Sequence, residues 1–221
     1  MIPLRDTQRS YSTPVVTVLL IVVNCVAFLY ELSLGQYARN HLIYVYGLVP
    51  DRLVPMSLVT SMFLHGGWLH ILGNMWFLWI FGDNVEDVLG HGKYLLFYLL
   101  CGVAAGLAHL VTNLGSPVPT VGASGAIAGV MGAYLVKFPR ARVTTLVPVF
   151  IFLTTFDLPA AFVLGYWFLI QFFSGVGTVT SSHLTERGVA WFAHVGGFLT
   201  GILLIWVLPT SRAYERRKLR W

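Results

Sequence analysis

The sequence predicts an all-α membrane protein, a bundle of six transmembrane helices, and three observations carry that prediction. Of the 221 residues, 57% are hydrophobic and only 10% are charged. Soluble domains carry about 25% charged residues, so a chain this apolar cannot cover a water-facing surface. Six apolar runs approach the ~20 residues that a helix needs to cross a bilayer core. Finally, the basic residues fall mostly on one side of the membrane that these runs define.

The six runs set the expected spans in order. The first follows a charged segment and no small-residue cleavage site comes after it, so we interpret it as a retained span rather than a signal peptide. The second carries His70 and Asn74, which must face other helices or water. The remaining four are apolar and bounded by polar, glycine-rich or proline-containing segments. The expected spans are about Val15–Leu32, Trp68–Phe81, Tyr94–Thr112, Ser124–Phe138, Pro159–Phe173 and Val189–Leu208.

Two connections need separate interpretation. Val143–Phe156 is also apolar, but Pro148 and Pro159 interrupt any helix there, and the remainder is too short to span unaided. We interpret it as an interfacial or re-entrant segment. The longest loop, residues 33–64, contains apolar stretches, so we expect it to be ordered and partly embedded.

Charge predicts the orientation. With six spans, eleven of the 14 Lys and Arg residues lie on the side that holds both termini. The positive-inside rule places that side in the cytoplasm, and a seventh span would spoil the bias by moving the basic tail outside. We expect one membrane domain over residues 1–221, with a core of about 14–208, a cytoplasmic segment 1–13 and a basic tail 209–221. Without an organelle-type presequence or a soluble extension, the sequence favours a bacterial plasma (inner) membrane.

Other function classes find little support. The net charge of +5 comes from basic residues beside apolar runs, with no aromatic-interleaved patch, so we expect no nucleic-acid partner. Cys25 and Cys101 lie inside apolar runs, and no metal-ligand spacing is present, so we expect no metal and no cofactor. The sequence does not indicate an oligomeric state.

A polar constellation lies at the external ends of three spans. Ser124 opens the fourth span after Gly122, and His194 sits about one and a half turns into the sixth. A serine hydroxyl becomes a nucleophile when a histidine takes its proton. The helix N-terminus at Ser124 supplies free N–H groups for an oxyanion. His70 and Asn74, four residues apart on one helix face, can donate to the same oxyanion.

Small residues indicate how these groups could meet. Gly197 lies within about 60° of His194 on a helix, and Gly125 begins a small-residue face on the fourth span. Small faces let membrane helices approach closely. Each signal also has a purely structural interpretation: Ser124 as a helix cap, His194 as an interhelical hydrogen bond, His70 and Asn74 as polar contacts between helices. We expect His65 to fix a loop, His109 to pack, and the carboxylates of residues 82–87 to cap and pair.

The ordered motifs HGGWLHILGN (65–74), GASG (122–125) and AHVGG (193–197) resemble the rhomboid family of intramembrane serine proteases, over roughly residues 14–208. The resemblance implies a six-helix bundle with a water-filled cavity and a catalytic dyad, Ser124 and His194, without an acid. It implies an oxyanion site of His70, Asn74 and the Ser124 backbone N–H, with His65, Gly122, Gly125 and Gly197 as structural neighbours. It also implies substrates that are transmembrane helices, cleaved near the outer membrane face, and a mobile cap over 174–188.

Two departures from the family pattern stand out. The Trp-Arg pair that many relatives carry in the first loop is replaced here by Met56 and Ser57, and an aromatic residue that stacks on the base in some relatives is replaced by Ala128. Something else must therefore position His194. Two alternative functions are a catalytically inactive member that binds membrane clients and a transporter. The presence of both Ser124 and His194 disfavours the first, and the lack of internal repeats disfavours the second.

Overall fold

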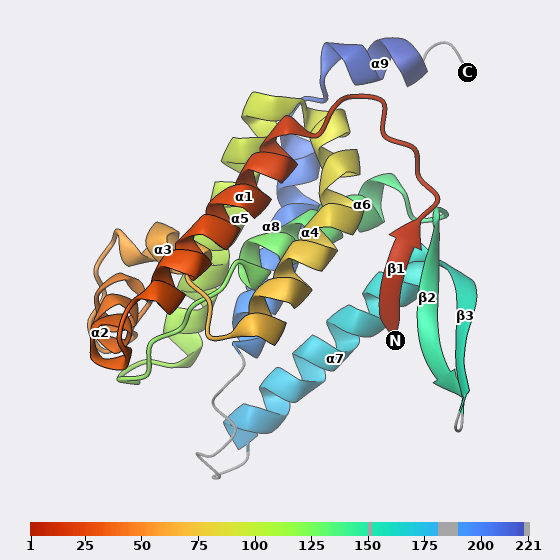
Figure 1. Ribbon diagram of the computed structural model, residues 1–221. Coiled ribbons are helices and arrows are strands. Elements are labelled where there is room, and N and C mark those ends of the chain that lie inside the picture. The colour runs from red at the N-terminus through yellow and green to blue at the C-terminus, as the bar shows by residue number, and fades with distance from the viewer. Residues whose placement is uncertain (150–151, 181–189, 219–221) are drawn as a thin grey trace.

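The computed structural model describes residues 1–149, 152–180 and 190–218, and within them it is mostly helical (Figure 1). Each of the six predicted spans corresponds to a helix, with ends that differ by up to about eight residues from those expected. The helices that match the predicted spans are α1 (Val15–Ser33), α4 (Trp68–Leu89), α5 (His91–Thr112), α6 (Ser124–Lys137), α7 (Ala160–Thr180) and α8 (Trp191–Val207).

Three of these helices, α1, α5 and α7, are long and apolar enough to cross a membrane. The helices α6 and α8 are apolar but shorter, at 14 and 17 residues. Helix α4 has 22 residues and is mostly apolar, but it carries polar residues near its start, at His70 and Asn74, and near its end, over residues 83–87. The molecule is thus a multi-pass membrane protein, in which ten of the 14 residues of the short helix α6 are buried.

The long first loop is ordered, as expected. It contains α2 (Gln36–Tyr46), α3 (Ser57–Thr60) and a 3-10 turn, η1 (Ser61–Phe63). Leu48, Val49 and Met62 are buried against the bundle. An isolated antiparallel bridge, in which Leu48 and Thr120 exchange backbone hydrogen bonds of 2.9 and 2.8 Å, joins this loop to the segment before α6.

The distal end of α4 organises the start of α1. Glu86 is fully buried and accepts hydrogen bonds from the backbone N–H groups of Val16 and Thr17, each at 2.8 Å, and from the Thr17 hydroxyl at 2.7 Å. A carboxylate at this position satisfies N–H groups that have no partner within the helix and complements its dipole. Asp87 pairs with Arg217 of α9 (Arg212–Lys218) at 2.5 Å. The expected capping and pairing by these carboxylates is confirmed.

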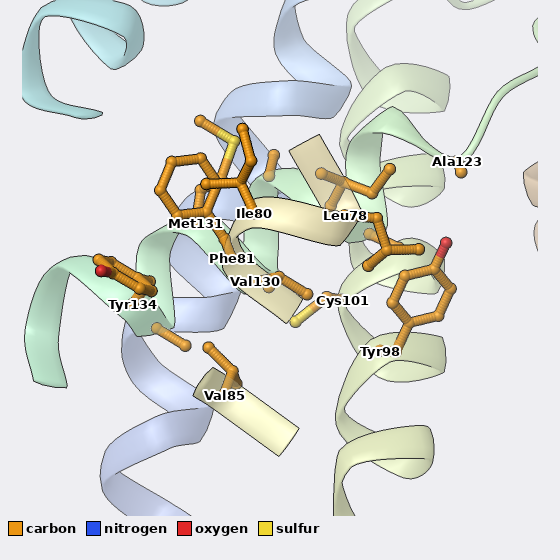
Figure 2. Packing of buried hydrophobic residues seen from close by; sticks show 14 of the residues in the cluster. Leu78, Ile80, Phe81, Val85, Tyr98, Cys101, Ala123, Val130, Met131 and Tyr134 are labelled. Carbon is orange, nitrogen blue, oxygen red and sulfur yellow. The ribbon is translucent and has the colours of Figure 1, made fainter. Parts of the chain in front are cut away.

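The core lies between α4, α5 and α6. Figure 2 shows Leu78, Phe81 and Val85 of α4 pointing toward Tyr98 and Cys101 of α5 and Val130, Met131 and Tyr134 of α6. All eight side chains are at most 1% exposed. Gly90, with φ of 77°, makes the turn from α4 to α5 in a conformation that favours glycine.

The expectation of a purely helical fold is wrong in one region. Two strands follow α6, β2 (Arg142–Val149) and β3 (Phe152–Pro159), and β1 (Ile2–Asp6) adds to β2 in an antiparallel sheet of order β1-β2-β3. The two prolines that exclude a helix here lie at Pro148 within β2 and Pro159 at the end of β3. The segment is rich in Val, Thr, Phe and Leu, which favour strands.

Helix α7 lies apart from the other helices over much of its length (Figure 1). It packs chiefly on α8, through Phe168, whose ring stacks on Phe198 with centroids 4.8 Å apart, and Trp167, whose ring lies 6.1 Å from the same residue. The expected cap over 174–188 is helical up to Thr180, where α7 ends, and its remainder lies outside the described residues.

Candidate active site

Ser124 is the first residue of α6, and the two residues before it set its position. Gly122 has a φ of 127°, which glycine adopts readily and other residues rarely do. Its backbone N–H donates to the Ser61 carbonyl at 2.9 Å, which ties the segment to the first loop. Ala123 is fully buried beneath the turn. The serine hydroxyl is thereby held at the edge of a cavity rather than in the core.

His194 faces this hydroxyl from α8. Its Nε2 lies 2.7 Å from Ser124 Oγ, a hydrogen-bonded contact between residues 70 positions apart in the chain. Because α8 begins at Trp191, His194 stands in the first helical turn, slightly nearer the helix end than predicted. The distance is what a base needs to accept the proton of a nucleophile.

The approach of α6 to α8 depends on glycine at both helices. A Cβ added at Gly197 would lie 2.0 Å from the Gly125 carbonyl oxygen, and one added at Gly201 would lie 1.9 Å from that of Gly129. No side chain fits at those distances, so the two backbones are in direct contact. The predicted small-residue packing between these helices is therefore confirmed, and the Gly125–Gly197 contact lies within one turn of the Ser124–His194 contact.

His70 and Asn74 lie on the same face of α4, beside Gly122. A Cβ added at Gly122 would be 2.6 Å from His70 Nε2 and 3.6 Å from Asn74 Nδ2. The backbone N–H of Gly66 points at His70 Nδ1 at 3.4 Å, an arrangement that leaves the hydrogen on Nε2. Asn74 is 7% exposed, and its Nδ2 has no hydrogen-bond acceptor among the described residues. Two N–H donors thus lie near Ser124 with room for an acceptor.

Two further histidines hold loops at the site. His65 is 2% exposed, its ring meets those of Phe28 and His70 edge to face, and its backbone N–H donates to the Glu31 carboxylate at 3.1 Å. This agrees with a loop-fixing role. His109 does more than pack, because its Nε2 lies 2.7 Å from the Thr120 hydroxyl and so anchors the segment that leads to Gly122.

One residue beside His194 was missed by the sequence analysis. Gln171 of α7 places its Oε1 2.6 Å from His194 Nδ1, and the ring of Trp167, one turn earlier, has its centroid 5.7 Å from that of the imidazole. The only sequence signal was a glutamine within a long apolar run. Ala128, at the position where some relatives have an aromatic residue, is buried.

These residues surround a cavity of about 880 Å³. Ser124, His194, His70, Asn74 and Gly122 all line it, together with apolar groups from α4, α5 and α6. Within the described part of the chain, no three His, Cys, Asp or Glu side chains are grouped as ligands of a metal ion would be. The polar side chains that line the cavity include the hydroxyls of Ser61, Ser124 and Thr120, the imidazoles of His70, His109 and His194, and the amide of Asn74.

Comparison with known proteins shows similarity to the Rhomboid domain and to proteins named rhomboid. The model of the Rhomboid domain matches residues 54–211. The chain is 29% identical over 170 residues to Rhomboid protein 1, mitochondrial, of Saccharomyces cerevisiae, and 37% identical over 112 residues to Rhomboid protease GluP of Bacillus subtilis. It is 28% identical over 193 residues to Rhomboid-like protein 11, chloroplastic, of Arabidopsis thaliana. These alignments cover 75%, 49% and 84% of this chain, but only 44%, 21% and 65% of the respective relatives.

Proposed function

The chain belongs to the rhomboid family, and from that premise we propose that it is an intramembrane serine endopeptidase that cleaves transmembrane-helix substrates by a Ser124–His194 dyad. The observation that carries the proposal is the 2.7 Å contact between Ser124 Oγ and His194 Nε2. A packing role for either residue alone would not require the pair to meet at a cavity that also holds two N–H donors.

In the proposed reaction, Ser124 Oγ attacks the carbonyl carbon of the scissile peptide while its proton passes to His194 Nε2. The carbonyl π electrons move to the oxygen and form a tetrahedral oxyanion. Its collapse breaks the C–N bond, and the imidazolium gives its proton to the leaving amine. Water then attacks the acyl ester on Ser124 in the same way, which releases a carboxylic acid and restores the hydroxyl.

The oxyanion is stabilised by three donors in this proposal. They are His70 Nε2, Asn74 Nδ2 and the backbone N–H of Ser124, which begins a helix and has no partner within it. The unpartnered, buried Asn74 amide supports this role, since an unsatisfied buried amide costs about 1–3 kcal/mol. Donors held in place before the reaction need no reorganisation when charge develops, and removal of one such donor typically costs about 10²–10³ in rate.

The orientation we propose has six helices spanning the membrane, both termini in the cytoplasm and the site toward the outer face, as in a bacterial plasma membrane. The charge bias of the sequence supports it. So does the distal end of α4, where Asp87 binds Arg217 and the Val88 carbonyl accepts from the Ser211 N–H at 2.7 Å, so that the basic tail is held at the end of the bundle where α1 begins. Ser124 and His194 lie at the opposite ends of α6 and α8 from Lys137 and Val207.

The test is cleavage of single-span membrane proteins in proteoliposomes that contain the purified chain. Ser124→Ala and His194→Ala should each abolish the cleavage product, while Ser33→Ala, which removes an exposed hydroxyl at the end of α1, should cleave like the wild type. The cut should map within the membrane-spanning segment of the substrate, toward its outer end. Undiminished cleavage by Ser124→Ala would end the assignment, and a folded wild type that cleaves no substrate would favour a client-binding role.

A further inference from the structure

Gln171 is a polar, buried residue in the apolar helix α7. Helix α7 is otherwise almost entirely apolar, yet the Gln171 side chain is only 7% exposed. Burial of an amide costs free energy unless it is hydrogen-bonded. Its Oε1 finds that partner on another helix, at His194 Nδ1, 2.6 Å away.

The two nitrogens of His194 are therefore both engaged, on opposite sides of the ring. Nε2 contacts Ser124 Oγ on α6, and Nδ1 contacts Gln171 Oε1 on α7. An amide oxygen only accepts hydrogen bonds, so Nδ1 must carry the hydrogen in this contact. In a neutral imidazole the other nitrogen, Nε2, is then the bare one and faces the serine hydroxyl.

We propose that Gln171 is a positioning residue that holds the imidazole of His194 in the tautomer and orientation in which Nε2 accepts the Ser124 proton. This inference rests on the proposed protease function, and it extends the dyad with a third, uncharged member. The role matches what the buried carboxylate does in a Ser-His-Asp triad, where loss of the acceptor leaves the wrong tautomer. The Gln171 side chain would also help to orient the His194 ring, which Ala128, at the position of the stacking aromatic residue of some relatives, cannot do.

Within the described part of the chain, Gln171 is the acceptor that faces Nδ1 of His194. The ring is approached by Ser124 of α6 and by Trp167 and Gln171 of α7. Among the residues that the structure describes, the other titratable groups that influence the ring are two histidines, His70 of α4 and His109 of α5, and neither is an anion. The positive charge that His194 gains during the reaction is thus met by an amide dipole.

The experiment measures the rate at which a small fluorophosphonate labels Ser124, because this reaction needs an activated serine but no transmembrane substrate. Gln171→Met keeps the size of the side chain and removes the acceptor, and Gln171→Leu is a second variant without one. Gln171→Glu keeps an acceptor and adds a negative charge. Phe168→Leu is the matched control, since Phe168 packs α7 on α8 without contacting the imidazole. Melting temperature and the folded fraction are measured on the same samples.

We expect Gln171→Met and Gln171→Leu to label about 10- to 100-fold more slowly per folded molecule, the range for loss of a hydrogen bond to a group that becomes charged. Gln171→Glu should be labelled faster than Gln171→Met at high pH. The acid limb of its pH–rate profile should move to higher pH by about one unit or more, because a nearby carboxylate favours the protonated imidazole. Phe168→Leu should melt at a lower temperature with an unchanged profile.

Three results would overturn the inference. In the first, Gln171→Met or Gln171→Leu is labelled at the wild-type rate. In the second, the labelling rate of these variants falls only as much as that of Phe168→Leu at an equal loss of melting temperature, which would make the role of Gln171 one of packing. Gln171→Glu could label as slowly as Gln171→Met with an unshifted acid limb. A wild type that is not labelled at Ser124 at all would instead refute the proposed function, so the two failures are distinguishable.

Discussion

The contact between α6 and α8 makes Gly197→Ala an informative perturbation of the site. The added Cβ would lie 2.0 Å from the Gly125 carbonyl oxygen, which is about 1.4 Å closer than the 3.4 Å at which ordinary contact begins. A carbonyl in the first turn of a helix cannot move away alone, so the helices must separate by about that distance. Gly197 is three residues from His194, and Gly125 is next to Ser124, so the separation acts directly on the dyad.

The expected consequence is loss of the hydrogen bond between the dyad residues. A separation of about 1.4 Å would lengthen the 2.7 Å contact to roughly 4 Å, beyond hydrogen-bonding range. Misplacement of a catalytic group by about 1 Å can cost 10² in rate. Overpacking of this kind typically costs about 1–3 kcal/mol of stability. We therefore expect turnover per folded molecule to fall by about 10² or more in a protein that still folds.

The assay is turnover of a reconstituted substrate together with melting temperature. Gly165→Ala is the matched control, because nothing lies within 4 Å of a Cβ added at Gly165 of α7. It should keep wild-type turnover and melt at the same or a slightly higher temperature. Wild-type turnover in Gly197→Ala would refute the reasoning that direct backbone contact between α6 and α8 holds the dyad together.

Three further predictions follow from other parts of the molecule. Asn74→Ala should lower the chemical rate by about 10²–10³ with little change in substrate affinity, whereas a role in helix packing alone would lower the melting temperature and spare turnover. Asp6 accepts hydrogen bonds from Tyr134 and Asn84, and its burial raises the pKa of this carboxyl to about 6. Because the folded protein then binds the proton more tightly than the unfolded chain does, the melting temperature should fall as pH rises from 4 through 6. Asp6→Asn should flatten that dependence. Chelators such as EDTA should leave proteolysis unchanged, and loss of activity that zinc restores would contradict a serine mechanism.

The parts of this fold that could be predicted are those with local signals. Long apolar runs mark the helices, and the order of polar motifs along them places Ser124, His194, His70 and Asn74 at one end of the bundle. The glycines at Gly125 and Gly197 signal close helix contact, because small residues in such positions serve packing. These features depend on the spacing of residues within one helix, or on the fact that successive spans cross the membrane in opposite directions.

The features that escaped prediction depend on contacts distant in sequence. β1 pairs with β2 across about 140 positions, with Ile2 opposite Leu146, and nothing in either segment specifies the other. β2 is rich in apolar residues that would also suit a membrane surface, and β1 carries the charged residues Arg5 and Asp6. Gln171 escaped for a similar reason: a polar residue in an apolar run indicates that a partner exists, but only the rotation of α7 against α8 shows that the partner is His194.

The most direct test of the account is to locate the adduct formed by a fluorophosphonate on the wild-type protein and on His194→Ala by peptide mass spectrometry. We expect phosphonylation of Ser124 in the wild type, and little or none at any residue in His194→Ala, because the hydroxyl is nucleophilic only with its base beside it. An adduct on another residue of the wild type, or equal labelling of Ser124 in the absence of His194, would contradict it.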